Sequence, residues 1–359
     1  MVPWLFSSLV IKFKMVADPV NSVIFKNRFF IYRVMKVLGI ESTAHTFSVA
    51  VIEEKKVLSN ARDLYTTESG GMVPVELGEH HVACCDTVFK TALEKAGCTM
   101  ADISLISFSQ GPGQGHALRI GAFFARALAS KWNLPIVGVN HCVAHLSVGS
   151  MVTDVKDPVL LYASGANTQI IAYEAGKYRI FGETLDCGIG NFLDTLAREL
   201  GLGFPGGPKI YELSLKGRDL LDVPYVVKGM DLSFGGILTN LKQKYAKGAS
   251  KEDIAFTAQE IAFSMLIEVA ERAMAHCDKK ELLLGGGVAC NLRLQDMAKK
   301  MCAERSAKCF ILENQFNIDN AAMIAWQGLL EFQAGKKQAV TDTTILPYWR
   351  TDDVFVNWK

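Results

Sequence analysis

The stretch Pro135-Ile136-Val137-Gly138-Val139-Asn140-His141-Cys142-Val143-Ala144-His145 indicates the fold class. Its first half is a short apolar run typical of a buried strand. The polar Asn140-His141 pair follows at the carboxyl end of that strand, where α/β proteins place their ligands. A helix from this point sets His141 and His145 one turn apart on one face, within reach of a single metal ion. A pair of ordinary, partly buried histidines is the other interpretation that this spacing leaves open.

Length and composition indicate a globular chain with two domains or one domain of two lobes. The 359 residues are 50% hydrophobic and 21% charged, which is enough apolar material for a large core. The formal net charge of +1 does not point to nucleic-acid binding, so an RNA-binding surface would be local or supplied by a partner. The nine cysteines are scattered without a CxxC pair, which predicts a reducing, cytoplasmic location.

Residues 1–34 differ from the rest of the chain. They are apolar and basic, but their apolar runs are too short for a membrane helix and stand in the wrong order for a signal peptide. A first strand begins naturally at Met35. We therefore expect residues 1–34 to be an extension outside the core or a misassigned start, and we expect no membrane association.

A strand–turn–strand pattern occurs twice. Residues 37–43 predict a buried strand running into a polar turn, and residues 47–52 predict its return strand. Residues 159–163 and 169–173 repeat this plan around the turn Ser164-Gly165-Ala166-Asn167-Thr168. Two such hairpins predict two similar lobes facing each other across a cleft, with each turn presenting N–H groups to a polyphosphate.

Further segments carry polar or glycine-rich signals. Gly285-Gly286-Gly287 follows a predicted strand and allows close approach of backbone to a flat ligand, and Asn291 can bond a nucleobase or ribose. Asp194, on a predicted helix over 188–201, is either a ribose ligand or an exposed helix acid. Asp319, before a predicted helix, is either a helix cap or a third metal ligand. The lysines of residues 242–251 form either a solvated face or a local RNA-facing patch.

Taken together, these pieces resemble the universal tRNA threonylcarbamoyladenosine synthase family. The resemblance is strongest to its archaeal and eukaryotic branch, the catalytic subunit of the KEOPS complex that once carried the name O-sialoglycoprotein endopeptidase. It covers residues 35–359 and rests on a series of ordered blocks. The blocks are Gly39-Ile40-Glu41, Thr43-Ala44-His45-Thr46-Phe47, Gly111-Pro112-Gly113, Val139 to His145, Tyr162-Ala163-Ser164-Gly165, Asn167-Thr168-Gln169, Phe204-Pro205-Gly206-Gly207-Pro208, Gly286-Gly287-Val288-Ala289 with Asn291, Asp319-Asn320 with Ala322-Met323-Ile324-Ala325, and Tyr348 to Asp353.

The resemblance implies an α/β fold of the two-lobed actin/Hsp70/sugar-kinase-like ATPase type, with two similar lobes around a nucleotide cleft. Residues 35–158 and about 326–359 would form lobe I, and residues 159–325 lobe II. His141, His145 and Asp319 fall on the catalytic metal ligands, with Tyr162 as a nearby fourth. The ion implied is one divalent metal, iron or zinc, because nitrogen and carboxylate ligands suit both.

The resemblance also implies contacts to ATP or threonylcarbamoyl-AMP. The residues that fall on these contacts are Tyr162, Ala163, Ser164, Gly165, Ala166, Asn167, Asp194, Gly207, Tyr211, Gly286, Gly287 and Asn291. Two positions depart from the family pattern. Ala166 replaces the second glycine of Ser-Gly-Gly-Asn-Thr, which costs about 1 kcal/mol if the position needs a positive φ. Tyr211 stands where archaeal members usually carry a glutamate, with Glu212 one residue later, so the ribose contact there stays open.

The implied activity moves a threonylcarbamoyl group from threonylcarbamoyl-AMP to the adenosine 3′ of the anticodon in tRNAs that read ANN codons. The implied partners are tRNA and KEOPS-type subunits, including a small kinase/ATPase and a dimerising subunit. Because the AMP leaving group is already activated, such an enzyme mainly has to position two substrates and stabilise charge on the carbamoyl oxygen. No residue stands out in the sequence as a general base.

Three other functions fit parts of the sequence. A metalloprotease would need a glutamate beside the first histidine, where Cys142 stands. A sugar- or acid-kinase-like ATPase shares the implied fold but has no use for the histidine pair. A noncatalytic, ATP-binding scaffold paralogue lacks such histidines, but Ala166 and Tyr211 keep this alternative open.

Overall fold

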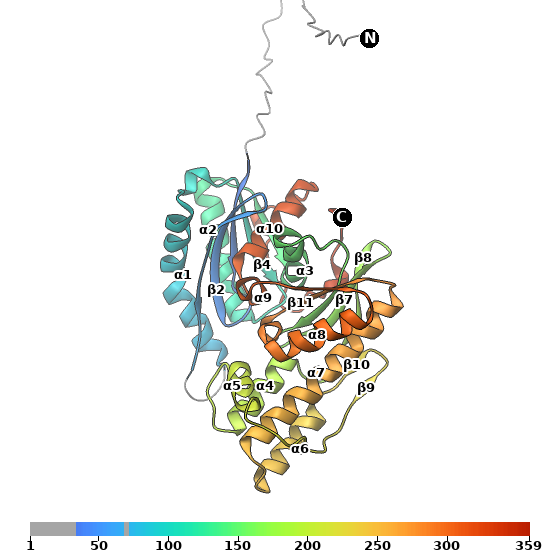
Figure 1. The fold of residues 1–359 in the computed structure, drawn as a ribbon. Coiled ribbons are helices and arrows are strands. Elements are labelled where there is room, and N and C mark those ends of the chain that lie inside the picture. The colour runs from blue at the N-terminus through green and yellow to red at the C-terminus, as the bar shows by residue number, and fades with distance from the viewer. Residues whose placement is uncertain (1–33, 68–71) are drawn as a thin grey trace, which may run out of the picture. The chain divides into compact units, whose positions relative to one another are not determined.

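The computed structural model describes residues 34–67 and 72–359 (Figure 1). The predicted extension, apart from Val34, lies outside the described residues. Residues 34–359 form one compact unit. This unit contains two five-stranded sheets and a short two-stranded one.

The first sheet has the order β3-β2-β1-β4-β5. The strands are β1 (Lys36–Glu41), β2 (Thr46–Glu53), β3 (Lys56–Leu64), β4 (Leu105–Gly111) and β5 (Ile136–Asn140). The first three form an antiparallel meander, and β4 and β5 continue it in parallel with β1. The connecting helices are α1 (Pro74–Ala96), η1 (Met100–Asp102) and α2 (Gly115–Trp132), and α3 (His141–Val152) follows β5.

The second sheet repeats this plan with the order β12-β11-β6-β7-β8. The strands are β6 (Val159–Ala163), β7 (Thr168–Glu174), β8 (Lys177–Glu183), β11 (Glu281–Gly285) and β12 (Lys308–Ile311). Again three strands form an antiparallel meander and two extend it in parallel. The predicted duplication of a hairpin-based lobe is confirmed.

The helices of the second half are more numerous. They are α4 (Ile189–Glu199), α5 (Gly206–Ser214), α6 (Gly235–Ala246), α7 (Lys251–His276), η2 (Gly287–Cys290), α8 (Leu292–Glu304), α9 (Asn314–Asn317), α10 (Ala321–Gln333), η3 (Val340–Asp342) and η4 (Thr351–Asp353), with the ribbon β9 (Val227–Lys228) and β10 (Asp231–Leu232) between α5 and α6. No helix in the described part of the chain is long and apolar enough to cross a membrane.

Three large apolar cores hold these layers together, and a small fourth cluster contains Tyr65, Leu77 and Ala117. One packs α1 and α2 on the outer face of the first sheet, and another packs α4, α6, α7 and α8 on the second sheet. The third joins side chains of both sheets with those of α3 and α10. These two helices are labelled in Figure 1. Helix α3 is buried almost all round because it lies in this shared core, which suits its apolar sequence. The site at its first turn is therefore built on rigid elements.

Several element predictions need correction. Strands β3 and β8 were not predicted, because charged and polar residues interrupt their apolar pattern. Such residues are typical of strands at the edge of a sheet, where both strands lie. The helical spacing of Val82, Cys85, Val88, Phe89 and Leu93 predicts a helix over residues 79–96. Helix α1 begins five residues earlier, at Pro74, because proline fits the first helical turn. The glycines and prolines of residues 203–208 predict a rigid loop, but the segment becomes helical at Gly206. Helix α10 packs on β1, β2 and β4, and the predicted lobe boundary near residue 326 falls inside it; the division into lobes stays a prediction.

Candidate metal and nucleotide site

The histidine pair lies at the first turn of α3. The Asn140 side chain caps this helix by accepting from the Val143 N–H at 3.1 Å, so the helix begins directly after β5. His141 is 4% exposed and His145 is 1% exposed. Their ring centroids are 4.7 Å apart, as one turn of helix predicts.

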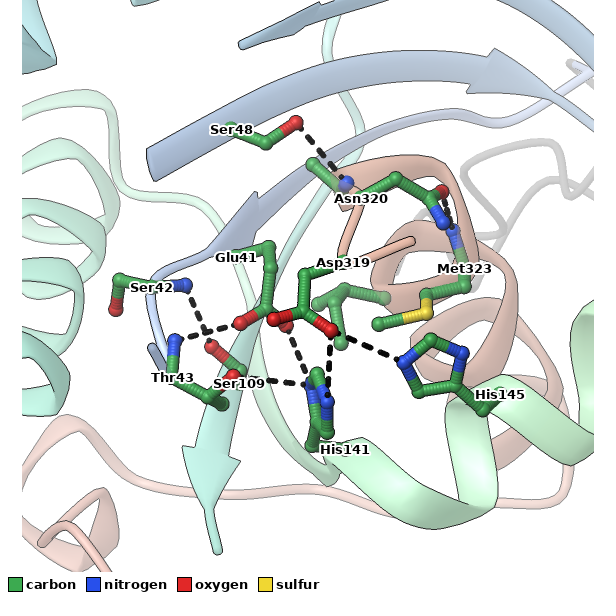
Figure 2. Close-up of polar contacts among 12 residues, drawn as sticks. Glu41, Ser42, Thr43, Ser48, Ser109, His141, His145, Asp319, Asn320 and Met323 are labelled. Carbon is green, nitrogen blue, oxygen red and sulfur yellow. Dashed lines mark hydrogen bonds and ion pairs between the residues drawn. The ribbon is translucent and has the colours of Figure 1, made fainter. Parts of the chain in front are cut away.

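Asp319 faces both imidazoles (Figure 2). Its Oδ1 lies 3.3 Å from His141 Nε2 and 3.3 Å from His145 Nε2. The helix that follows is capped by Asn320, whose side chain accepts from the Met323 N–H at 3.1 Å. The interpretation of Asp319 as a helix cap is therefore wrong, because Asn320 caps the helix. The Asp319 carboxylate contacts the two histidines instead.

Glu41, at the end of β1, holds the other side of His141. Its carboxylate is fully buried, and Oε2 lies 2.9 Å from His141 Nδ1 (Figure 2). The other oxygen, Oε1, accepts from the Thr43 N–H at 2.6 Å. A carboxylate on Nδ1 selects the tautomer whose Nε2 lone pair points at Asp319, the arrangement that a metal-binding histidine needs.

Tyr162 closes the cluster from β6. Its hydroxyl lies 3.1 Å from His141 Nε2, and its ring lies 4.9 Å from that of His145. Burial raises the pKa of this phenol well above its ordinary value, so without a cation the hydroxyl stays protonated. The four residues of the predicted metal set thus converge from β6, α3 and the start of α10.

The cluster fits a divalent ion. The three ligand atoms of His141, His145 and Asp319 lie within 4.8 Å of one another. Ligands bound tetrahedrally at about 2.1 Å would stand about 3.4 Å apart, close to the two 3.3 Å separations around the Asp319 oxygen. Such buried nitrogen and oxygen donors suit zinc or iron.

The electrostatics of the cluster favour a cation between these groups. Burial lowers the pKa of His145. For His141 burial acts in the same direction, but the carboxylates of Glu41 and Asp319 outweigh it and hold the pKa of His141 well above its ordinary value. Burial alone would raise the pKa of Asp319, yet the histidines hold it well below its usual range. A divalent ion at the two Nε2 atoms would supply the positive charge that the His141 proton otherwise provides.

The second predicted feature, the turn after β6, is held rigidly. The Asn167 carbonyl accepts from both the backbone N–H and the hydroxyl of Ser164, at 3.0 Å each. The N–H groups of Gly190 and Asn191 at the start of α4 donate to the carbonyls of Ser164 and Gly165. Ala166 is exposed and is not among the described non-glycine residues with positive φ. The substitution of alanine for glycine therefore causes no backbone strain here.

Two predicted glycines behave differently after β11. Gly286 has φ +91°, and a Cβ atom there would stand 2.4 Å from the Ala163 carbonyl oxygen. Glycine is thus required, because the chain passes against the end of β6 in a left-handed conformation. A Cβ on Gly287 would meet nothing within 4 Å. Gly287 is therefore open, and backbone approach by a ligand is possible there.

Asp194 and Gly207 meet at the start of α5. Asp194 Oδ1 accepts from the Gly206 N–H at 2.7 Å, which satisfies a donor at the start of that helix. Burial raises the pKa of the Asp194 carboxyl. Asp194 is therefore not a plain exposed helix acid, and its role as a ribose ligand stays a prediction. Gly207 is the next residue of the same turn. A Cβ atom added there would meet only Leu193, at 4.0 Å, so the space beside this glycine is open.

Tyr211 and the neighbours of Asn291 line a pocket of about 470 Å³. The lining residues are Tyr211, Ser214, Leu215, Gly217, Phe256, Gln259, Glu260, Leu292, Arg293 and Asp296. A chain of hydrogen bonds runs along it: Asn291 donates to Gln259 at 2.8 Å, and Gln259 donates to Ser214 at 3.0 Å. The Asn291 oxygen also caps α8, so its side chain is largely occupied by structure.

The sequence interpretation missed several residues of this site. Glu41 and Thr43 were predicted only as part of a turn that faces phosphate, and their contacts with His141 were not predicted, although an acid at the end of a buried strand is the signal for a ligand position. Gln259 and Arg293 carried no signal because they lie within otherwise ordinary helices. The predicted basic patch is also reduced, since Lys242 pairs with Glu199 and Lys251 donates to the Leu200 carbonyl.

Known proteins resemble this chain over most of its length. The TsaD family model, described as tRNA N6-adenosine threonylcarbamoyltransferase, matches residues 56–326. A protein of that description from Thermococcus kodakarensis is 54% identical over 325 residues, which cover 90% of this chain and 100% of the relative. Another from Thermofilum pendens is 44% identical over 329 residues, covering 91% of this chain and 98% of the relative.

A distant solved structure shares the fold. The crystal structure of component A of (R)-2-hydroxyglutaryl-CoA dehydratase from Acidaminococcus fermentans is 14% identical, with a TM-score of 0.53 over 83% of this chain and 98% of that one. Likeness at this identity concerns architecture alone, and it confirms the predicted two-lobed ATPase-type fold. The sequence matches and the fold lead to one assignment: the chain belongs to the TsaD family of tRNA N6-adenosine threonylcarbamoyltransferases.

Proposed function

We propose that this chain transfers a threonylcarbamoyl group from threonylcarbamoyl-AMP to N6 of the adenosine that lies 3′ of the anticodon in tRNAs reading ANN codons. The observation that carries this proposal is the convergence of His141, His145 and Asp319 on one point beside the turn after β6. Membership of the family supplies the reaction class, and the cluster supplies a site suited to it.

The reaction is an acyl transfer. The N6 lone pair attacks the carbamoyl carbon and forms a C–N bond, the bond from that carbon to the phosphate oxygen breaks, and AMP leaves with the electron pair. The N6 proton is lost to solvent or to the departing phosphate. Because AMP is a good leaving group, positioning and charge stabilisation provide most of the acceleration.

His141, His145 and Asp319 would hold the metal ion, with Tyr162 beside them as a fourth ligand. When bound, a divalent ion supplies Lewis-acid polarisation of a carbonyl and orientation of the substrate. Glu41 acts through His141 as a positioning residue, since it touches Nδ1 and not the face shared with Asp319. These roles, and the choice of zinc or iron, are proposals.

The nucleotide part of the substrate is assigned to the second set of residues. The turn Ser164–Asn167 and the open backbone at Gly287 would receive the phosphate, because both expose backbone near the end of β6. The adenosine would enter the pocket beside Tyr211, whose ring takes the place of a family glutamate and offers a stacking surface. Asp194 would act indirectly by holding Gly206 and Gly207 in place.

A noncatalytic scaffold is the second candidate, and one observation disfavours it. The buried metal-binding cluster is complete, and burying two histidines and two carboxylates costs free energy that a scaffold would have no reason to keep. A metalloprotease is disfavoured because Glu41 lies on the far nitrogen of His141, away from the face where a bound water would need a base.

We further propose that a KEOPS-type partner, including a kinase/ATPase and a dimerising subunit, supplies part of the tRNA-binding surface. The net charge is only +1, and two of the lysines in residues 242–251 are engaged within the chain. Phosphate contacts by basic side chains dominate affinity for nucleic acids, so a nearly neutral protein needs additional cationic surface.

Single-turnover transfer tests the proposal. The full chain, with and without candidate partner subunits, is mixed with threonylcarbamoyl-AMP and unmodified tRNA that reads ANN codons, and modified adenosine is quantified. The variant His141→Ala/His145→Ala should lose both product and bound metal. His276→Ala, which removes an exposed histidine at the end of α7, is the matched control and should lose neither. Metal binding without product under every partner combination would overturn the transferase assignment in favour of the scaffold.

A further inference from the structure

A second group of metal-binding side chains lies on the first sheet, away from the residues described above. Asp63 is near the end of β3, and His80 and Cys84 are on α1, which packs against that strand. The ligand atoms of these three residues all lie within 4.8 Å of one another. This group shares no residue with the His141 cluster.

We propose that Asp63, His80 and Cys84 form a second binding site for a divalent transition metal of the zinc type. His80 and Cys84 are four residues apart on one helix, so their side chains lie one above the other on the same face. Asp63 reaches the pair from the neighbouring strand, and its Oδ1 lies 2.9 Å from His80 Nε2. The site is thus assembled on a helix and a strand, which restrict the positions of its ligands.

The ligand chemistry matches a borderline metal. One imidazole nitrogen, one thiolate and one carboxylate are the three donor types found around protein-bound zinc, and three protein ligands leave a position for water. Deprotonation of the Cys84 thiol on binding would release one proton to solvent. The resulting thiolate and the Asp63 carboxylate would together neutralise the two charges of the ion.

The surroundings of His80 are those of a metal ligand. Its second ring nitrogen, Nδ1, lies 3.1 Å from Nδ1 of the fully buried His81. At this distance one of the two nitrogens carries a proton and the other accepts it. With a metal on Nε2 of His80, its Nδ1–H donates to His81, so His81 would fix the tautomer and the ring orientation. The ring of Tyr65 stands edge-on at 5.9 Å from His80 and limits its movement on the other side.

The cluster has little other purpose in the fold. Among residues 34–67 and 72–359, His80 is the only ion-pair partner of Asp63, whose side chain is 53% exposed. An ion pair so exposed contributes about 0–1 kcal/mol to stability. The Cys84 thiol makes a long contact of 3.8 Å with the His81 carbonyl, and its partly buried side chain packs against the core between α1, α2 and the first sheet. Giving up the ion pair between Asp63 and His80 to bind a cation would therefore cost little stability.

Cobalt(II) binding to the full chain tests the site, because a thiolate ligand gives cobalt a charge-transfer band in the near ultraviolet. The titrations use the background His141→Ala/His145→Ala, which removes the first site. In this background one equivalent of cobalt should bind with the thiolate band. Cys84→Ser should abolish the band. Asp63→Asn should weaken cobalt binding at least about tenfold, since losing even an outer partner of a metal ligand typically lowers metal affinity by about that factor.

The adjacent thiol provides a matched control. Cys85 is the next residue of α1, and its sulfur contacts the Val82 carbonyl at 3.4 Å, outside the proposed ligand set. Cys85→Ser should leave stoichiometry, affinity and band unchanged. Circular dichroism and thermal melts confirm that each variant is folded, and the exposed Asp63→Asn substitution provides a second readout if Cys84→Ser is unstable. Failure of the background protein to bind cobalt, or a band that survives Cys84→Ser or disappears with Cys85→Ser, would overturn the proposal.

Discussion

Replacing Glu41 with glutamine tests how the first metal site is organised. The Glu41 carboxylate accepts from two buried donors, the Thr43 N–H at 2.6 Å and His141 Nδ1 at 2.9 Å. A glutamine side chain has one acceptor oxygen and one NH₂ group, so it cannot accept from both donors. If the glutamine oxygen faces His141, its NH₂ group faces the Thr43 N–H and leaves that buried donor without an acceptor, at a cost of about 1–3 kcal/mol in stability. If the NH₂ group faces His141, the Thr43 N–H keeps its acceptor, but Nδ1 has to accept in place of donating.

The effect on metal binding depends on which way the amide turns. With the NH₂ group toward His141, Nδ1 becomes an acceptor and the proton moves to Nε2, which can then no longer bind a metal. With the oxygen toward His141, the correct tautomer survives but the charge of the carboxylate is lost. Loss of such an outer partner lowers metal affinity by about 10- to 100-fold, which corresponds to about 1.4–2.7 kcal/mol. We expect Glu41→Gln to fall in this range.

The assay is a competition titration with a chelator of known affinity, combined with urea unfolding of the metal-free protein. Glu53→Gln is the control, since Glu53 ends β2 and makes an exposed ion pair with Lys36 at 3.1 Å. The control should bind metal like the wild type. Metal affinity in Glu41→Gln within twofold of the wild type would refute the reasoning that the carboxylate sets the tautomer of His141.

Three further outcomes follow from single contacts. Gly286→Ala should destabilise the protein by about 1–3 kcal/mol and weaken ATP binding in calorimetry, because φ is +91° and the new Cβ would stand 2.4 Å from a carbonyl oxygen. Gly287→Ala is the control: its new Cβ would stand in open space, so the substitution should be nearly neutral. Tyr211→Ala should keep the fold and weaken ATP binding by about 1 kcal/mol or more, a loss of base stacking; unchanged affinity would remove Tyr211 from the nucleotide site. Asp186 accepts from N–H groups at the start of α6, and Asp186→Ala should cost about 1 kcal/mol in urea unfolding. Burial opposes ionisation of the Asp186 carboxyl, but its hydrogen bonds lower its pKa to about 2. The stability that this carboxylate contributes is therefore present above its pKa in the unfolded chain, about 3.9, and is lost as pH falls toward 2. Equal acid sensitivity of wild type and Asp186→Ala would contradict this.

Local patterns predicted a large part of this molecule. The apolar runs and turns of residues 37–52 and 159–173 correspond to the two hairpins, because alternation and turn chemistry act between near neighbours in the chain. The His141–His145 spacing predicted a shared face because helical geometry alone sets it. The glycine run 285–287 was predicted to allow close approach of a ligand. The structure requires glycine at residue 286 for a different reason, since the chain itself passes close to the Ala163 carbonyl there.

Local sequence patterns did not predict the edge strands or the residue that caps α10. Strands β3 and β8 carry polar residues on their solvent side, so their apolar period is weak, and only pairing with β2 and β7 makes them strands. Asp319 read equally well as a cap or a ligand, because both roles suit an acid before a helix. The choice depended on whether Asn320 would cap α10, and that contact appears only in the folded chain.

The sequence by itself determined the types of the central strands and main helices, the repeat of the strand hairpin and the identity of the histidine pair, since these depend on periodicity and on interactions along a few residues. The tertiary structure alone decided that Glu41 would meet His141 across 100 positions, and Asp319 would meet His145 across 174. It also brought Asp63 to His80 and Cys84. Contacts of this kind depend on how sheets and helices pack in space, and packing depends on the whole set of buried side chains at once, which no local pattern records.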